Sequence, residues 1–140
     1  MTNNFTIGFT CGVFDLMNAG HVIMLERVKN HCDYLIVGLQ TDPTIDRTES
    51  KSKPIQSIIE RQIQLKSCKF VDEIIVYEAE ADLEEILETL DINIRFMGID
   101  HKNGFVTGEE ICKRRGIEII YLERGGNYSS SDLKRRVREK

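Results

Sequence analysis

The sequence has no tryptophan, only two prolines and only four cysteines in 140 residues. The cysteines lie far apart and form no C-x-x-C pair, which excludes the usual zinc patterns and a dense disulfide framework. No apolar run approaches the roughly 20 residues that a membrane span requires, and the first residues lack the basic and apolar regions of a leader. We therefore expect a cytoplasmic protein with reduced thiols, without a membrane span and without a metal bound by its own side chains.

Basic charge is also in deficit, since 19 lysines and arginines face 23 aspartates and glutamates and the net charge is −4. This balance excludes a general nucleic-acid binder, which usually carries a basic excess. Nine of the acidic residues fall between Asp72 and Asp91, where no lysine or arginine occurs, and we expect this stretch to form a solvated face or a partner surface. The remaining chain carries a basic excess, which suits a small anionic substrate.

Five short apolar runs alternate with five stretches of helical spacing. This alternation predicts βαβ units in a single domain, 1–140, with a three-layer α/β/α Rossmann-like fold of about five parallel strands. The strands are expected at Phe5–Cys11, Tyr34–Leu39, Glu73–Tyr77, Ile92–Met97 and Ile117–Leu122, and the helices at Gly20–Asn30, Ile58–Cys68, Asp82–Leu90, Gly108–Arg115 and Ser130–Glu139.

Polar, glycine-bearing segments follow the predicted strands. In open parallel sheets, ligands bind beyond the carboxyl ends of the strands. The candidate segments are therefore Gly12–His21, Thr41–Lys53, Gly98–Gly104 and Arg124–Ser131. The second of them belongs to the long loop Thr41–Gln56, whose length alone is typical of a functional or disordered loop. His31 and His101 are expected at an exposed helix end and in a loop.

The first of these segments, TCGVFDLMNAGH, contains neither G-x-G-x-x-G nor a P-loop. Gly20 at the predicted helix start would let a phosphate approach free backbone N–H groups, and His21 in the first turn would add a ring N–H. The alternative is that Asn18 is an ordinary helix cap and that His21 lies on the helix surface.

Two motifs carry a resemblance to a known family. G-x-F-D-x-x-N-x-G-H after the first strand resembles the G-x-F-D-x-x-H-x-G-H signature of the nucleotidylyltransferase superfamily, with Asn18 in place of the first histidine. RGGNYSSS at Arg124–Ser131 resembles the R-T-x-G-I-S-T-T motif of cytidylyltransferases. The chain length and motif set are similar to those of the bacterial glycerol-3-phosphate cytidylyltransferases.

Three weaker matches extend the resemblance. MGID places Asp100 on the second acid of the family's M-G-D-D, and Arg61 falls on the arginine of E-R-x-x-x-L. Lys69 stands where a second arginine is usual, which keeps the charge but loses the bidentate fork. Lys51 and Lys53 stand where the family has its K-x-K phosphate-binding lysines.

The resemblance implies transfer of CMP from CTP to a small phosphoalcohol, glycerol 3-phosphate first, giving CDP-glycerol and pyrophosphate. It also implies Mg²⁺ bound with the triphosphate, and a homodimer. A phosphomonoester is largely dianionic at neutral pH, so its attack needs no general base. Two alternatives stay open: an adenylyltransferase of the same superfamily, and a non-catalytic nucleotide-binding paralogue, which Asn18 suggests.

The resemblance also assigns residues to roles, whereas Asp15 is expected to fix the turn. His21, Asn18, Arg124 and Lys51 are the implied catalytic residues. Nucleotide binding is implied for Cys11, Gly12, Val13, Phe14, Asn18, Gly20, His21, Asp100, Arg124, Tyr128, Ser129, Ser130 and Ser131, and acceptor-phosphate binding for Lys51, Lys53, Arg61 and Lys69.

Overall fold

The structure is a computed structural model that describes residues 5–47, 51–123 and 126–140. Strands and helices alternate as the sequence predicts, and most boundaries lie within two residues of the expected ones. The strands are β1 (Ile7–Gly12), β2 (Tyr34–Gln40), β3 (Glu73–Tyr77), β4 (Ile94–Gly98) and β5 (Glu118–Leu122). The helices are α1 (Ala19–Lys29), α2 (Ile58–Lys66), α3 (Glu80–Thr89), α4 (Glu109–Arg115) and α5 (Ser130–Arg138), with 3₁₀ turns η1 (Pro43–Ile45) and η2 (Ile99–His101).

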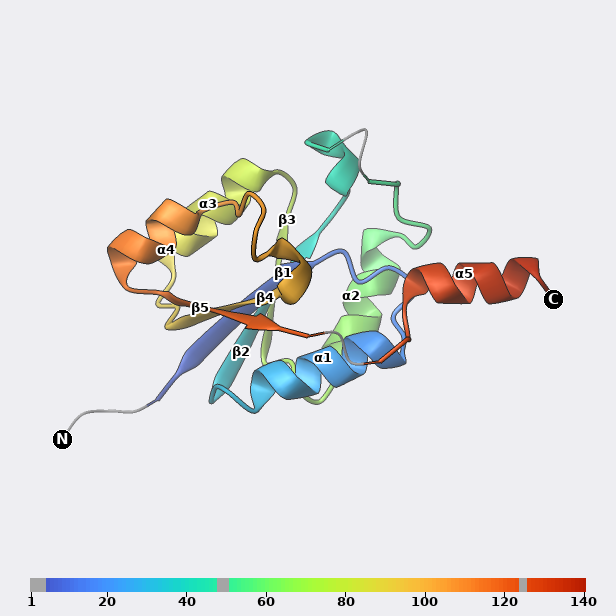
Figure 1. Cartoon of the computed structure of the whole chain (residues 1–140), viewed down its shortest axis with the longest axis horizontal. Helices are drawn as coiled ribbons and strands as arrows, with labels where there is room; N and C mark the ends of the chain where they lie inside the picture. The colour runs from blue at the N-terminus through green and yellow to red at the C-terminus, as the bar shows by residue number, and fades with distance from the viewer. Residues whose placement is uncertain (1–4, 48–50, 124–125) are drawn as a thin grey trace.

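The five strands form one parallel sheet in the order β3-β2-β1-β4-β5. Successive strands are added on one side of β1 as far as β3, and the chain then crosses back to add β4 and β5 on the other side of β1. Helices α3 and α4 lie together over one face of the sheet, and α1 and α2 cover the other (Figure 1). The predicted three-layer α/β/α fold is confirmed, and its switch point lies at the carboxyl ends of β1 and β4.

Each face of the sheet has its own apolar core. Phe9 and Ile36 pack with residues of α3 and α4 on one face, among them Leu87 and Cys112. On the other face, residues of α1 and α2 surround strand residues such as Val37. Because both faces are covered, the strands are continuous apolar runs rather than alternating ones.

The two central strands separate soon after they pair. β1 pairs with β2 along its whole length, from Ile7 to Gly12, but it pairs with β4 only at Gly8 and Phe9. Beyond that point the Thr10 hydroxyl donates to the carbonyl oxygen of Phe96 at 3.3 Å. A side chain thus replaces the backbone ladder where the strands part, and the gap lies at the switch point.

Local signals explain several helix boundaries. Ser57 caps α2 by accepting from the Glu60 N–H at 3.1 Å, while the Glu60 carboxylate accepts from the Ser57 N–H at 3.0 Å. Gly108 and Gly116 bracket α4 with φ values of 79° and 72°, a left-handed conformation that glycine adopts without strain. In the described part of the chain, no helix is long and apolar enough to cross a membrane.

Candidate active site

The turn between β1 and α1 places two non-glycine residues in the left-handed region. Phe14 and Leu16 have φ values of 53° and 51°, a conformation that is costly for residues with a Cβ atom. The carboxylate of Asp15, which lies between them, accepts from the backbone N–H groups of Ile55 at 2.8 Å and Gln56 at 2.9 Å. Asp15 therefore holds the turn against the end of the long loop, as the sequence analysis expects.

Asn18 is the N-cap of α1. Its Oδ1 accepts from the Gly20 N–H at 2.9 Å, and its Nδ2 donates to the Leu16 carbonyl at 3.0 Å and to Ser130 Oγ at 3.3 Å. Both ends of the amide are thus used inside the protein. The capping interpretation describes this geometry, and a contact between Asn18 and a triphosphate stays a prediction.

His21 lies in the first turn of α1, partly buried against the ring of Phe14, with 5.3 Å between ring centroids. Its Nδ1 accepts from the backbone N–H of Asn18 at 3.1 Å. Nδ1 is therefore unprotonated, and the neutral ring carries its proton on Nε2. Burial lowers the pKa of His21 below its usual value, while the charge of Asp15 opposes that shift. His21 is thus a neutral N–H donor at physiological pH.

The first turn of α5 is hydrogen-bonded directly to the β1–α1 turn. Ser129 caps α5 by accepting from the Asp132 N–H at 3.1 Å. Ser130 Oγ donates to the Asp15 carbonyl at 2.5 Å, across 115 residues of sequence, and accepts from Asn18. The two motifs from opposite ends of the sequence therefore meet, and the N-termini of α1 and α5 lie side by side.

Gly20 allows the loop before α5 to pack against α1. A Cβ atom at Gly20 would lie 2.4 Å from the carbonyl oxygen of Tyr128, so no side chain fits there. Packing alone therefore requires a glycine at this position, in addition to the close approach of a phosphate that the sequence suggests. The Tyr128 and Ser131 side chains are exposed at this end, and the predicted Arg124 lies outside the described residues.

Arg61 is buried, with 2% of its surface exposed, although the sequence analysis assigns it to the acceptor phosphate. Its guanidinium donates to the carbonyl oxygens of Val13 at 3.0 Å, Gln40 at 2.6 Å, Thr41 at 2.6 Å and Gln56 at 3.1 Å. Burial lowers its pKa. These four bonds join the β1 turn, the end of β2 and the long loop, so the geometry favours a positioning role over direct contact with a phosphate.

The predicted phosphate-binding lysines do not gather at one place. Lys51 and Lys53 are both exposed, and Lys51 lines the cavity described next, whereas Lys53 is absent from its described lining. Lys69 lies in a separate groove between the start of α1 and the end of α2, with Nζ 5.3 Å from the centroid of the Phe70 ring. A shared acceptor-phosphate site for all three lysines stays a prediction.

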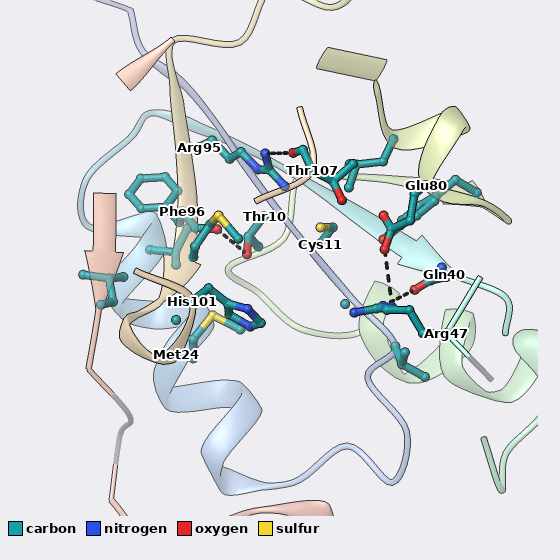
Figure 2. Close-up of a pocket in the computed structure, with 18 of the residues that line it drawn as sticks. Thr10, Cys11, Met24, Gln40, Arg47, Glu80, Arg95, Phe96, His101 and Thr107 are labelled. Atoms are coloured by element: carbon teal, nitrogen blue, oxygen red, sulfur yellow. Dashed lines mark hydrogen bonds and ion pairs between the residues drawn. The ribbon is translucent and has the colours of Figure 1, made fainter. Parts of the chain in front are cut away.

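A cavity of about 330 Å³ opens at the switch point (Figure 2). It runs from Met24 and Val28 of α1, across the gap between β1 and β4, to Glu80 and Leu83 of α3. The predicted nucleotide-binding residues Cys11, Gly12 and Val13 line it, whereas Phe14 belongs to the core, and Asp100 lies in η2 beside the lining residue His101. Its other lining residues are Thr10, Gln40, Arg47, Lys51, Tyr77, Arg95, Phe96, Met97, Gly98, Phe105, Thr107 and Leu122.

The α3 side of the cavity is polar. Arg47 Nε lies 3.4 Å from Glu80 Oε1, and Arg47 Nη2 donates to Gln40 Oε1 at 3.3 Å. On the same side, Arg95 Nη1 donates to the carbonyl oxygen of Thr107 (Figure 2). Two guanidinium groups thus belong to the wall of a cavity that also has an apolar half.

The sequence analysis missed three charged residues that line this cavity, Arg47, Glu80 and Arg95. Arg95 is the single charged residue in the apolar run INIRFMG, and that break in an otherwise buried strand is the signal that could have found it. Glu80 belongs to the acidic stretch that we expected to be a solvated face, but its carboxylate lines the cavity. Arg47 precedes the predicted lysines in the loop, and no motif singles it out.

Two weakly acidic side chains that line the cavity, those of Cys11 and Tyr77, stay neutral. Burial raises the pKa of the Cys11 thiol, although the charge of Arg95 opposes the shift. Burial likewise raises the pKa of the Tyr77 phenol, and the nearby Cys11 adds to the rise. Neither group therefore supplies a negative charge to the cavity at physiological pH.

Among the described residues, no group of three or more histidine, cysteine, aspartate or glutamate side chains could hold a metal ion. Mg²⁺ commonly binds through substrate phosphates and one or two carboxylates rather than in an all-protein cage. Mg²⁺ bound together with a nucleotide stays a prediction.

Known proteins match nearly the whole chain. The bifunctional protein HldE of Campylobacter jejuni subsp. jejuni serotype O:2 is 33% identical over 99% of this chain. The HldE protein of Rhodopseudomonas palustris is 31% identical over 95% of it. The chain spans 29% and 27% of the length of these two relatives. They support the superfamily but not the narrower likeness to a glycerol-3-phosphate cytidylyltransferase.

Solved structures share the fold. A lipopolysaccharide core biosynthesis protein from Thermoplasma volcanium superposes with a TM-score of 0.68 at 24% identity, covering 90% of this chain and all of that one. Pantothenate synthetase from Thermus thermophilus superposes with a TM-score of 0.64 at 8% identity, covering 91% of this chain and 61% of that one. Residues 9–136 match the family described as cytidylyltransferase-like, and the chain therefore belongs to the cytidylyltransferase-like nucleotidyltransferases.

Proposed function

We propose that this chain transfers a nucleoside monophosphate from a nucleoside triphosphate to the phosphate of a small phosphorylated acceptor. An acceptor phosphate oxygen attacks the α-phosphorus and forms a new P–O bond. The bond from the α-phosphorus to the bridging oxygen breaks, and pyrophosphate leaves with both electrons. Because the acceptor phosphate is largely dianionic at neutral pH, the step needs no residue to remove a proton.

The observation that carries this proposal is the direct contact between the first turns of α1 and α5. The hydrogen bonds from Asn18 to Ser130 and from Ser130 to the Asp15 carbonyl bring two helix N-termini together. Each N-terminus has free backbone N–H groups and the positive end of a helix dipole. Two such ends side by side suit a polyanion such as a triphosphate.

His21 is the residue that we propose stabilises the transition state. Negative charge grows on the oxygens of the five-coordinate phosphorus, and a fixed donor aimed at that charge lowers the barrier. The bond from the Asn18 N–H to Nδ1 holds the ring and leaves the proton on Nε2. The neutral ring can thus donate through Nε2 without first capturing a proton from solvent.

Mg²⁺ bound to the triphosphate would neutralise charge on the leaving pyrophosphate. Lys51 is a cation of the long loop and lines the cavity, and we propose that it shares this charge neutralisation from the protein side. Arg124, from the serine motif, has the same proposed role toward the β- and γ-phosphates.

The identity of the donor nucleotide is the first point to decide. The sequence resemblance favours CTP with glycerol 3-phosphate, whereas the similarity to the HldE proteins favours the adenylyltransferase alternative. We therefore propose ATP as the first donor to test and CTP as the second, with the acceptor restricted to small phosphorylated alcohols and sugars.

Pyrophosphate release tests this function. The protein is incubated with Mg²⁺, with each of ATP, CTP, GTP and UTP in turn, and with a panel of phosphorylated alcohols and sugars. We expect acceptor-dependent pyrophosphate release with one triphosphate, ATP first. Tight nucleotide binding without release for any acceptor would instead support the non-catalytic alternative.

The expected homodimer has a candidate surface on α2 and the loop residues just before it. Ile55, Ile59 and Ile63 recur every four residues, and each exposes more than half of its surface. An exposed apolar stripe of this kind is typical of a protein interface. We propose that it pairs two copies of the chain, and the molar mass in solution of the wild type and of Ile59→Glu tests this.

A further inference from the structure

We propose that Arg95 binds a second anionic group of the acceptor. The acceptor is then a small molecule that carries a carboxylate or a second phosphate in addition to the phosphate that attacks. This inference rests on the proposed function, since it concerns the second substrate of the same reaction.

The burial of Arg95 is the first observation. Arg95 is 2% exposed, in the middle of the parallel sheet, yet it is one of the residues that line the cavity. Nη1 donates to the carbonyl of Thr107, and Nε has no hydrogen-bond partner among the described residues. The thiol of Cys11, which burial keeps neutral, also interacts with Arg95.

The missing counter-ion is the second observation. No carboxylate in the described part of the chain forms an ion pair with Arg95, and Glu80, the carboxylate in the described lining, is paired with Arg47. The lining holds three cationic side chains, those of Arg47, Lys51 and Arg95, against this one carboxylate. A buried cation is costly unless an anion compensates its charge, and an anionic ligand would do so here.

The position of Arg95 indicates which substrate would carry that anion. Arg95 is in register with Phe9, whose ring belongs to the core on the α3 and α4 face. Helix α1, whose first turn meets that of α5 where we propose the triphosphate, lies on the other side of the sheet from α3 and α4 (Figure 1). A ligand group at Arg95 therefore belongs to the part of the acceptor farthest from the triphosphate.

The surroundings of Arg95 suit a carboxylate or phosphate group on an acceptor that also carries hydroxyl groups. Tyr77 contributes a phenol that burial keeps protonated, and Thr107 also lines this wall. A guanidinium group is planar and offers paired N–H groups that match the geometry of a carboxylate or a phosphate. A neutral alcohol would leave the charge of Arg95 uncompensated, so selection against it is expected.

Two matched pairs of compounds test this proposal on the wild-type chain. Glycerol 3-phosphate and 3-phosphoglycerate differ by a hydroxymethyl group and a carboxylate, and glucose 1-phosphate and glucose 1,6-bisphosphate differ by a second phosphate. Binding of each compound is measured by calorimetry, with Mg²⁺ and the preferred triphosphate analogue present. We expect the member with the extra anion to bind about tenfold or more tightly in at least one pair. The pair that shows the difference identifies the type of oxyanion.

Variants of Arg95 separate recognition from folding. Arg95→Gln keeps an N–H donor for the Thr107 carbonyl but removes the charge, and Arg95→Lys keeps the charge but loses the fork. In Arg95→Gln the preference within the pair should fall to about threefold or less, since the charge that compensates the anion is gone. The affinity for the member with a single anionic group and for the nucleotide should stay near the wild-type value. Arg114→Gln, at an exposed arginine paired with Glu88, is the matched control.

Equal binding within both pairs on the wild type would overturn the proposal, and so would a failure of all four compounds to bind. A loss of affinity for both members of a pair in Arg95→Gln would assign Arg95 to the anchoring of Thr107 alone. If Arg95→Gln does not fold, the comparison on the wild type still decides. Absence of pyrophosphate release with every triphosphate would contradict the proposed function. The preference within a pair is measured by binding alone, so it tests the role of Arg95 independently of that result.

Discussion

The two halves of the candidate site differ in how far the protein satisfies its own polar groups. At the start of α1 and α5, Asn18, Ser130 and Asp15 bond to one another and to backbone groups. On the α3 side of the cavity, Arg95 is buried with one carbonyl partner and an orphaned Nε. The first half is preorganised before any ligand binds, whereas the second half has a buried positive charge that no carboxylate among the described residues compensates.

This difference separates reaction from recognition. Preorganised donors suit the chemical step, because they need not reorient as charge develops. An uncompensated buried charge suits selection among acceptors, because a wrong acceptor leaves it unpaired. The comparison predicts that changes in the α1–α5 half reduce the rate for every acceptor, and that changes near Arg95 alter the choice of acceptor.

Replacing the proposed donor should have the largest effect on rate. His21→Ala is expected to lower kcat by about 10²-fold or more for every acceptor, the size found when one transition-state donor is lost. Steady-state pyrophosphate release measures it. His31→Ala, at an exposed histidine beyond the other end of α1, should behave as the wild type. A drop below about threefold in His21→Ala would remove His21 from the chemical step.

Removing the buried Arg61 should reduce stability more than selectivity. Arg61→Met leaves four carbonyl oxygens without their donor, and we expect a loss of about 3 kcal/mol or more in the free energy of unfolding. Urea denaturation measures the loss. Arg135→Met, at an exposed arginine of α5, controls for the loss of charge. If Arg61→Met were as stable as the wild type but bound phosphorylated acceptors weakly, Arg61 would contact substrate after all.

Adding one carbon at Gly20 should loosen the contact between α1 and α5. Gly20→Ala places a Cβ atom against the Tyr128 carbonyl, and relieving the overlap is expected to cost about 1–3 kcal/mol of stability. Activity should fall with every acceptor, because the two helix starts move apart. Gly104→Ala is the matched control, since its nearest neighbour lies at 4.0 Å. An unchanged melting temperature and unchanged activity in Gly20→Ala would mean that α5 can shift freely.

The pH dependence of stability should report the state of His21. Its pKa in the folded chain lies below the usual value of 6.5, so the unfolded chain binds the proton more tightly. The stabilisation of the folded chain that comes from the lowered pKa of His21 is therefore complete above pH 6.5. It is lost as the pH falls toward the folded-state pKa. Unfolding free energies between about pH 5 and 8 should show this slope in the wild type and not in His21→Gln. Identical slopes in both proteins would contradict a depressed pKa.

The substitution expected to change least is the one that restores the usual family histidine. Asn18→His can still cap α1 or bond to Ser130 but cannot replace all three bonds of the amide. We expect activity equal to or above that of the wild type, because an added imidazole can donate to a phosphate. Initial rates of pyrophosphate release measure it. A complete loss would show that the turn is built around asparagine.

The fold was predictable from the sequence because helices and strands have different apolar spacing. The meeting of Ser130 with Asp15 was also within reach, since both follow parallel strands and therefore face the same edge of the sheet. The position of Arg61 was not predictable, because a helix arginine is usually exposed and nothing local indicates that four carbonyls converge on it. The position of Glu80 was not predictable either, because nothing local distinguishes it from the other acidic residues around it.

The bond between Ser130 and Asp15 also orders events during synthesis. Translation produces Asp15 long before Ser130, and 115 residues separate the two partners. A nascent chain can pair β1 with β2 early, but the contact between the first turns of α1 and α5 is complete only once α5 has left the ribosome. The contact between the two motifs therefore forms only after all five strands of the sheet have been synthesised.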